Sequence, residues 1–470
     1  MEPESNRAAD AADPCAPAPR DAIGHRVVRE PRNDSDEKLE RETLRRVTWR
    51  LMPYVFGLFL VSIVDRGNLG FAALSMNRQL HLTGAMFGIG VGLFFLAFAV
   101  FMIPSNLAMA RFGARTVLTR IAIGWGAVTM LMAFVQGPYS FYALRALLGA
   151  AEAGIAPGLL LYLSYWFPAR YRARNNAIFT YSVPASYVLT AIVSGWILEM
   201  DGMLGLPGWK WLFLLEGLPA IVLGIIGLRV LTDAPAQAAW LSAPQRDWLR
   251  RRLDDEAPAP VLAQRARLRH VIAHPLVLML AMINAGIFAG LATLSTWLPQ
   301  IVHTFGWSPH LLGPVVALPP AAGALGLFFV SRHSDRHGER VKHLHAMLLL
   351  AAAAYAVIAL SRGPAAILAG FCFANIGIYA SMTVFWTIPQ TYLPRNIAAA
   401  GIGTISAAGS VAGFAVTTLI GRVQDATHSL TSCFSIVIVV LLVASGVLLI
   451  IDRQLREPPS SSAQAPLPMH

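Results

Sequence analysis

The sequence predicts an all-α polytopic membrane protein, with twelve transmembrane helices arranged as two six-helix bundles. The first reason is composition: 56% of the 470 residues are hydrophobic and only 13% are charged, which excludes a set of ordinary soluble domains. The second reason is that apolar runs long enough to cross a bilayer recur along nearly the whole chain. The third reason is that short motifs of the first half recur in the second half.

Windows of about 19 residues separate the apolar runs into twelve spans. In the first half these spans cover residues 49–74, 84–108, 116–136, 139–166, 174–198 and 209–231. In the second half they cover residues 275–301, 309–330, 343–361, 364–391, 397–421 and 430–452.

The distribution of arginine and lysine predicts the orientation of these spans. Basic residues cluster before the first span and after the second, fourth and eighth spans, whereas the alternate loops carry very few. Because cytoplasmic loops carry the excess of Lys and Arg, both termini are expected in the cytoplasm, as in a multi-pass protein of a bacterial-type inner (plasma) membrane. The net charge of +11 is therefore a topology signal and does not indicate nucleic-acid binding. The expected organisation is a disordered cytoplasmic tail at 1–45, bundles at 46–232 and 273–453, a cytoplasmic linker at 233–272 and a tail at 454–470.

This orientation can be checked by labelling single cysteines from outside the cell. A cysteine at position 250 should not react with an impermeant reagent, because the linker is expected inside. A cysteine in the turn at 136–139 should react. The reverse pattern would invert the predicted topology.

The linker between the two halves contains one expected helix. Ser242 followed by Gln245 resembles a capping box, which predicts a short amphipathic helix through Leu253. The arginines of this segment are compatible with binding to anionic lipid, and equally with a solvated connection between the halves.

The two halves resemble repeats of each other. A basic motif after the second span recurs after the eighth span, roughly 225 residues later. Its members are Arg111, Gly113 and Arg115 in the first half and Arg336, Gly338 and Arg340 in the second. Such repeats predict two bundles related by an axis along the membrane normal, with a central site between them.

The fourth span contains charges inside its apolar run. Arg145 and Glu152 are two helical turns apart, about 10 Å along one helix face. A charge near mid-membrane costs roughly 3 kcal/mol, so such residues normally face a cavity and mark a transport pathway. Gly149 predicts close approach of a neighbouring helix, and Pro157 predicts a kink. The alternative is that the two charges lie at the membrane interface or form a structural pair.

A second charged group interrupts the first span, where Asp65 and Arg66 are followed by Asn68. The alternative is that this group marks the outer mouth of the span. If all four charges share one bundle, their chemistry suits anion transport. Guanidinium binds carboxylate bidentately and keeps its charge, so it can hold an anion. Burial disfavours the charged form of a carboxylate, so Asp65 and Glu152 can take up and release protons.

Several motifs make the chain similar to the major facilitator superfamily and, within it, to the anion:cation symporter family. They are DRGNLGFAA at 65–73, IPSN at 103–106, FGAR at 112–115, YLSYWFPAR at 162–170, GWKWLFLLEG at 208–217, SRHSDR at 331–336, and Phe385-Trp386 with Pro389. The resemblance covers about residues 45 to 455. It extends to permeases for tartrate, phthalate, 4-hydroxyphenylacetate and sugar acids.

The resemblance implies roles for individual residues. It makes Asp65 and Glu152 the proton-coupling candidates, and Arg66 and Arg145 the substrate-binding or charge-balancing candidates. The gating loops are expected to contain Arg111, Gly113, Arg115, Asp335, Arg336, Gly338 and Arg340. The first loop departs from the family pattern, because Ala110 stands where an aspartate is usual.

Other polar and aromatic residues are candidates to line the substrate site. In the tenth span Asn375, Tyr379 and Trp386 follow helical spacing, although hydrogen bonds between helices would explain them equally well. The full set of further substrate-binding candidates is Asn68, Tyr181, Asn375, Tyr379, Trp386, Ser406 and Ser410. Ser406 and Ser410 stand where the family often has Asn, and Phe98 stands where sugar-acid relatives often have Tyr. These differences disfavour a heavily hydroxylated substrate.

We therefore expect proton-coupled uptake of a small organic carboxylate, preferably an aromatic or other monocarboxylate, by alternating access. The alternatives are a tartrate or sugar-acid symporter of the same family, a drug exporter, and a non-transporting receptor. We expect a functional monomer in the bilayer that is not an enzyme, has protons as its coupling ion, and uses no other cofactor, metal or nucleic acid. Cys15, Cys372 and Cys433 show no spacing typical of a disulfide or metal site.

Overall fold

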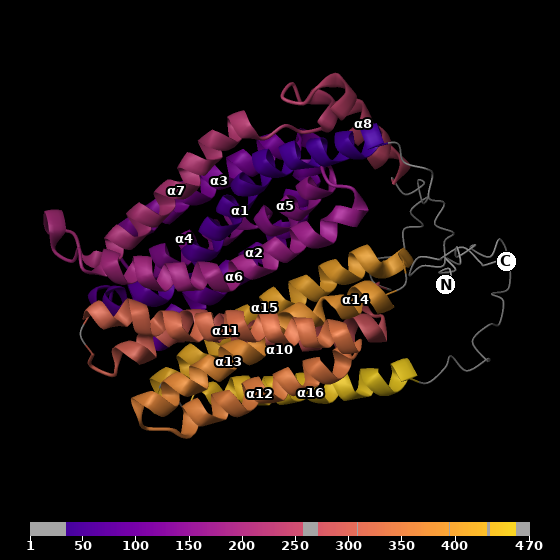
Figure 1. The fold of residues 1–470 in the computed structure, drawn as a ribbon. Helices are drawn as coiled ribbons and strands as arrows, with labels where there is room; N and C mark the ends of the chain where they lie inside the picture. Colours follow the sequence, from indigo (N-terminus) through magenta and orange to yellow (C-terminus); the bar gives the residue numbers. More distant parts are fainter. Residues whose placement is uncertain (1–33, 257–270, 308, 394, 430–432, 457–470) are drawn as a thin grey trace, which may run out of the picture.

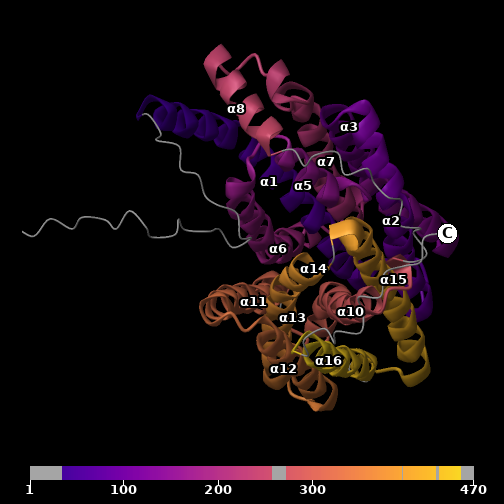
Figure 2. The same cartoon turned by 90° about the vertical axis from the view of Figure 1, so that its right-hand side faces the viewer.

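The computed structural model describes residues 34–256, 271–307, 309–393, 395–429 and 433–456. Inside some helices only the backbone is described, as at 172–181. The described chain is almost entirely helical, and Figures 1 and 2 show the helices as two groups that pack side by side.

The first group contains the helices before the linker. They are α1 (Asp34–Gln79), α2 (Gly84–Phe112), α3 (Ala114–Leu131), α4 (Pro138–Glu152), α5 (Ile155–Ser164), α6 (Ala169–Leu198) and α7 (Gly208–Val230). Short 3-10 turns follow α3, α6 and α7: η1 (Met132–Phe134), η2 (Met203–Gly205) and η3 (Pro235–Gln237). Helix α8 (Ala243–Asp255) lies on the linker side of this group.

The second group contains the helices after the linker. They are α10 (Pro275–His303), α11 (Pro309–His337), α12 (Arg340–Leu360), α13 (Pro364–Phe385), α14 (Thr387–Tyr392), α15 (Arg395–Thr427) and α16 (Phe434–Arg456). Between the groups, α2 packs on α15, α6 on α11 and α1 on α10.

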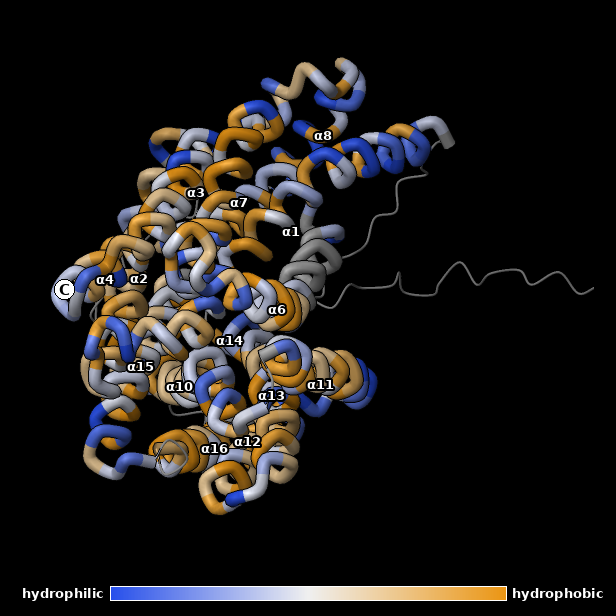
Figure 3. The backbone as a smooth tube through the Cα atoms, turned by 90° about the vertical axis from the view of Figure 1, so that its left-hand side faces the viewer, coloured by the Kyte–Doolittle hydropathy of each residue, from blue (hydrophilic) through white to orange (hydrophobic). Residues whose placement is uncertain are grey.

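The described helices have the length and apolarity of membrane spans. Eleven segments are long and apolar enough to cross a bilayer, and the apolar part of α6, Ser182–Leu198, is a shorter one. Figure 3 shows hydrophobic residues along the packed helices and hydrophilic residues on α8 and at the start of α1. The prediction of an all-α polytopic protein is confirmed.

Two parts of the predicted cytoplasmic regions are ordered helices. Helix α1 begins at Asp34, so residues 34–45 are helical where the sequence suggested a disordered tail. The reason is packing, because Thr43 and Leu44 are buried in this part of α1. The expected linker helix is present as α8, and its Gln245 Oε1 accepts a hydrogen bond from the Ser242 amide at 3.2 Å, as in a capping box.

The fourth predicted span is broken, and the break follows from Pro157. Helix α4 ends at Glu152 and α5 begins at Ile155. Pro157 has no N–H to donate to the carbonyl four residues earlier, at Ala153, so the helix is interrupted there. Gly154 lies in the break against Ser105 of α2, and an added Cβ would be 1.9 Å from the Ser105 hydroxyl oxygen. The neighbouring helix therefore approaches as closely as the glycines predict.

The repeat predicted between the halves is visible in the backbone. Gly113 joins α2 to α3 with φ = +85°, and Gly338 precedes α12 with φ = +67°. Both values lie in the left-handed region, which a glycine adopts without steric cost. The same reversal therefore occurs at equivalent points of the two bundles.

Contacts between the halves gather at the end of the molecule remote from α8 and from the start of α1, on the left in Figure 1. We call this the distal end; under the predicted topology it is the outer side. Asp425 near the end of α15 accepts hydrogen bonds from the amides of Gly84 (2.7 Å) and Ala85 (2.8 Å) at the start of α2. A carboxylate is favourable there because a helix N-terminus carries partial positive charge.

Two further contacts join α6 to α11 at the distal end. His310 Nδ1 lies 2.6 Å from Glu199 Oε1. Gly195 and Gly313 meet directly, since a Cβ on Gly195 would be 3.0 Å from the Cα of Gly313. The halves are thus fastened together at this end.

Candidate functional site

The predicted charges of the first and fourth spans meet in the first bundle. Arg66 on α1 donates its Nε–H to Glu152 Oε1 of α4 at 2.8 Å, and its Nη2 lies 2.8 Å from the same oxygen. The Glu152 side chain is completely buried, whereas that of Arg66 is 19% exposed. Glu152 Oε2 has no hydrogen-bond partner among the described residues. Arg66 therefore binds only one oxygen of Glu152, and the other oxygen, Oε2, makes no hydrogen bond to a described residue.

Arg145 lies two helical turns from Glu152 on the same face of α4 and is only 4% exposed. Its Nε–H points to the Gly90 carbonyl at 3.4 Å, and its guanidinium lies 4.7 Å from the centre of the Phe94 ring. No carboxylate of the described residues pairs with it, although Asp65 and Glu152 both act on it electrostatically. Since Glu152 pairs with Arg66, the alternative of a structural Arg145–Glu152 pair does not hold in this conformation.

Asp65 lies deep inside α1 and is 2% exposed. Trp125 of α3 donates its indole N–H to Oδ2 at 3.0 Å, and Asn68 donates its amide to Oδ1 at 3.3 Å. Helix α1 continues to Gln79, so Asp65 and Asn68 do not mark the outer mouth of the span. Asp65 is held by neutral donors, and a buried carboxylate in such surroundings can exchange a proton more readily than one in a tight ion pair.

Phenylalanines of α2 separate the two arginines. The Arg66 guanidinium lies 5.7 Å from the Phe94 ring centre and 4.8 Å from that of Phe98. Phe94 therefore contacts both guanidiniums, and cation–π attraction holds them without neutralising their charge. Close packing makes this possible, because an added Cβ on Gly149 of α4 would be 2.2 Å from the Phe94 carbonyl.

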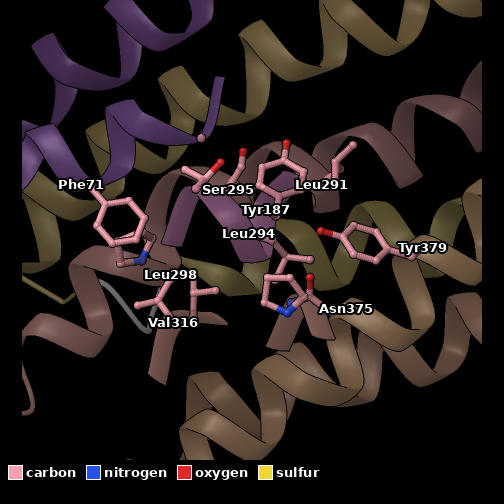
Figure 4. Close-up of a pocket in the computed structure, with 13 residues that line it drawn as sticks. Phe71, Tyr187, Leu291, Leu294, Ser295, Leu298, Val316, Asn375 and Tyr379 are labelled. Atoms are coloured by element: carbon pink, nitrogen blue, oxygen red, sulfur yellow. The ribbon is translucent and has the colours of Figure 1, made fainter. Parts of the chain in front are cut away.

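A pocket lies between the halves, close to this charge cluster in sequence and in space. Its walls come from α1, α6, α10, α11 and α13, and its volume is about 20 Å³. Figure 4 shows Tyr187, Ser295, Asn375 and Tyr379 around it, with the apolar side chains of Phe71 and Leu294. The rings of Tyr187 and Tyr379 stack across the halves, with centroids 6.4 Å apart.

The pocket brings together some of the predicted substrate residues. Asn375 and Tyr379 line it. The Asn375 amide also donates to the Phe371 carbonyl of its own helix at 2.9 Å, so one of its two N–H groups is already used. Asn68 does not line this pocket, because it faces Asp65 inside the first bundle.

The remaining substrate candidates lie elsewhere. Trp386 caps α13 and is half-buried, next to Phe385. Ser410 donates to the Ser406 carbonyl at 3.5 Å, within α15. The side chain of Tyr181 lies outside the described residues.

The gating-loop residues lie at the end opposite the distal contacts. In the first half, Asp233 Oδ1 accepts from the Arg115 amide at 2.8 Å, and the Arg115 guanidinium donates to the Leu228 carbonyl. Arg111 lies over Phe112 at 5.3 Å. Asp233 thus supplies a carboxylate to a loop in which Ala110 replaces the usual aspartate.

In the second half, Asp335 lies 3.7 Å from Arg340, while Arg336 is exposed. Glu339, between Gly338 and Arg340, pairs with Lys342 at 2.6 Å. This hydrogen bond and the charge of Lys342 hold the pKa of Glu339 below its usual range. Both loops are therefore tied locally within their own halves.

Sequence reasoning missed two residues of this region. Tyr187 follows helical spacing with Thr190 and Ser194, a pattern that could have indicated a lining face of the fifth span. Glu216 is a carboxylate within the apolar run of α7, and it is 5% exposed. A charged residue inside an apolar span identifies Glu152 as a candidate, and the same criterion applies to Glu216. In the sequence Glu216 was considered only as part of the motif GWKWLFLLEG at 208–217.

The described side chains contain no group of His, Cys, Asp or Glu that could hold a metal ion. One buried and one partly buried guanidinium, two buried carboxylates and a pocket between two six-helix bundles instead define a secondary transporter of the twelve-helix class. The chain belongs to the major facilitator superfamily, since the family model of that description matches residues 55–417.

Relatives of known name are transporters. The chain is 43% identical to a protein of Agrobacterium vitis provisionally named a tartrate transporter, over 88% of this chain and 96% of the relative. It is 35% identical to the quinolone resistance transporter of Acinetobacter baumannii, over 86% and 93% of the two chains. It is also 35% identical to the inner membrane transport protein RhmT of Escherichia coli (strain K12), over 78% and 85%.

Solved structures support the fold. A bacterial homologue of the human lysosomal transporter Spinster matches with a TM-score of 0.71 at 16% identity, over 88% of this chain and 99% of that chain. A D-xylose-proton symporter matches with a TM-score of 0.68 at 14% identity, over 85% and 97%. The family and the named relatives, rather than these structures, show that the chain is a transporter of a small molecule and not an enzyme.

Proposed function

We propose that this protein imports a small organic carboxylate together with protons, by alternating access. The observation that carries the proposal is Arg145: a buried guanidinium without a carboxylate partner among the described residues, beside the Arg66–Glu152 pair. A fixed cation in a low-dielectric site calls for a counter-charge, and a carboxylate fits its planar fork.

The charge balance of the cluster explains how protons would couple to the substrate. Asp65 and Glu152 balance Arg66 and Arg145 when all four are ionised. A bound monocarboxylate adds one negative charge, which a proton on one of the two acids would offset. Protonation of Glu152 would also weaken its pairing with Arg66 and free that guanidinium for the substrate.

Rocking of the two halves would then move the neutralised site across the membrane. With the halves fastened at the distal end, this conformation corresponds to the state facing the opposite side. Each net positive charge carried inward with the potential gains about 2.3 kcal/mol per 100 mV, so stoichiometry sets how far substrate is concentrated.

The lining favours an aromatic or modestly polar monocarboxylate. Tyr187 and Tyr379 supply stacked aromatic surface in the pocket, and Phe71 adds a third ring to its lining. Ring stacking contributes about 0.5–1.5 kcal/mol beyond area burial. A hydroxylated dicarboxylate is the second candidate, because the relative of Agrobacterium vitis is named for tartrate.

Uptake into proteoliposomes tests this function. With an acidic outside and a neutral inside, the purified protein should accumulate a labelled carboxylate, and a protonophore should abolish the accumulation. A competition panel of phenylacetates, tartrate and sugar acids against the labelled substrate ranks the classes. Stronger inhibition by tartrate would replace the aromatic substrate with the second candidate. Efflux of a quinolone, or binding without transport, would contradict the proposed import.

A further inference from the structure

Glu216 on α7 is a buried carboxylate that the transport mechanism above does not use. The Ser194 hydroxyl of α6 donates to its Oε1 at 2.9 Å. Its Oε2 is buried and has no hydrogen-bond partner among the described residues. No Arg, Lys or His of the described chain pairs with it, so it differs from Glu152, which has a guanidinium beside it.

The helices packed around Glu216 contribute neutral groups and one acid. Helix α1 brings Asn68 next to the carboxylate, and Asp65 acts on it electrostatically. Helix α3 presents Gly126, which meets the backbone of Gly217 directly, since a Cβ on Gly126 would be 2.6 Å from the Gly217 carbonyl. Helix α6 contributes the Ser194 hydroxyl, and the turn η1 contributes apolar side chains.

These surroundings favour a neutral carboxylic acid at position 216. A carboxylate in the membrane interior that lacks a cation binds a proton rather than remain charged. Asp65, which acts on Glu216 electrostatically, is negative and would repel an ionised Glu216. Asn68 donates to Asp65 and lies next to Glu216, so its side chain stands between the two acids.

The three helices that surround Glu216 and Asp65, α1, α6 and α7, continue to a cavity at the distal end. That cavity has a volume of about 240 Å³ and is lined by Ser75, Arg78, Leu198 and Gly208, among others. Ser194 lies one helical turn inward from Leu198 on α6. Glu216 lies roughly 12 Å inward from Gly208 along α7.

We propose that Glu216 is a third proton-binding residue of the carrier and exchanges protons between the distal cavity and Asp65, with Ser194 and Asn68 orienting its carboxyl group. This inference rests on the proposed coupling to protons. It gives Glu216 a role in the proton step alone, without contact with the carboxylate substrate.

The replacement Glu216→Gln separates proton transfer from substrate transport. Glutamine keeps the shape of the protonated acid but cannot release a proton. Proton-driven uptake into proteoliposomes should slow on the order of a hundredfold, the lower range of what a positioned proton-transfer group contributes. Substrate counterflow without a pH gradient should keep its wild-type rate and KM, which also shows that the variant is folded. Ser194→Ala should slow proton-driven uptake in the same way.

The matched control is Asp254→Asn on α8, whose side chain is 72% exposed; it should leave both rates unchanged. Infrared spectroscopy adds an independent readout: at neutral pH the carbonyl band of a protonated carboxyl should be present in the wild type and in Asp254→Asn, and should lose intensity in Glu216→Gln. Wild-type proton-driven uptake by Glu216→Gln would overturn the role of Glu216 alone. Absence of proton-driven uptake in the wild-type protein would instead overturn the proposed coupling.

Discussion

Glu152→Gln is expected to abolish accumulation of substrate against its gradient while preserving exchange of substrate across the membrane. Glu152 is completely buried, and Arg66 donates to one of its oxygens at 2.8 Å. Glutamine can accept the same hydrogen bond through its amide oxygen, so the local geometry is retained. It cannot gain or lose a proton, so the exchange of charge that couples transport to the proton gradient is lost.

Asp65→Asn should show the same separation. The amide oxygen of the asparagine can still accept a hydrogen bond from the indole N–H of Trp125, so this contact between α1 and α3 is kept. The measurement is uptake driven by a pH gradient compared with counterflow, both in proteoliposomes, with Asp254→Asn on the exposed face of α8 as the control. Gradient-driven accumulation at the wild-type level in both variants would remove these acids from the coupling mechanism.

The membrane-spanning helices could be predicted from the sequence, because a membrane span requires a long apolar run and few other structures require one. The positions of α2, α7 and α10 agree with the predicted spans to within a few residues. The repeat could also be predicted, since Gly113 and Gly338 are needed at the same backbone reversal. The break between α4 and α5 follows from Pro157 and the carbonyl that it leaves without a donor.

The pairing of the charges could not be predicted. Spacing places Arg145 and Glu152 on one face of a helix, and the structure does bury both there. Which arginine Glu152 binds depends on how α1 packs against α4, and that contact joins residues far apart in the chain. The structure pairs Glu152 with Arg66 and leaves Arg145 over Phe94.

The pocket is similarly a product of packing. Asn375 and Tyr379 were candidates because of their helical spacing, but Tyr187 emerges only when α6 meets α13 across the two halves. The helical start of α1 at Asp34 was missed for the same reason. A polar, charged segment resembles a tail until burial of Thr43 and Leu44 is known.

Arg145→Lys is expected to weaken substrate binding by about 1–3 kcal/mol, or roughly 5- to 150-fold in Kd. Lysine keeps the positive charge but has no planar fork, so it cannot bind a carboxylate through two parallel hydrogen bonds. It also loses the stacking of the guanidinium on the Phe94 ring, which lies 4.7 Å away. The affinity of the purified protein can be measured by calorimetry with the best substrate of the competition panel.

Two comparison variants show whether the loss is specific to the site. Arg250→Lys, on the exposed surface of α8, should bind substrate with wild-type affinity, because its side chain is 67% exposed and makes only a surface ion pair with Asp254. Arg66→Lys should weaken binding as well, but it should also change the pH dependence of uptake, since Arg66 is the partner of Glu152. Arg145→Lys should leave that pH dependence nearly unchanged. Wild-type affinity in Arg145→Lys would mean that this guanidinium only packs α4 against α2, through Phe94 and the Gly90 carbonyl.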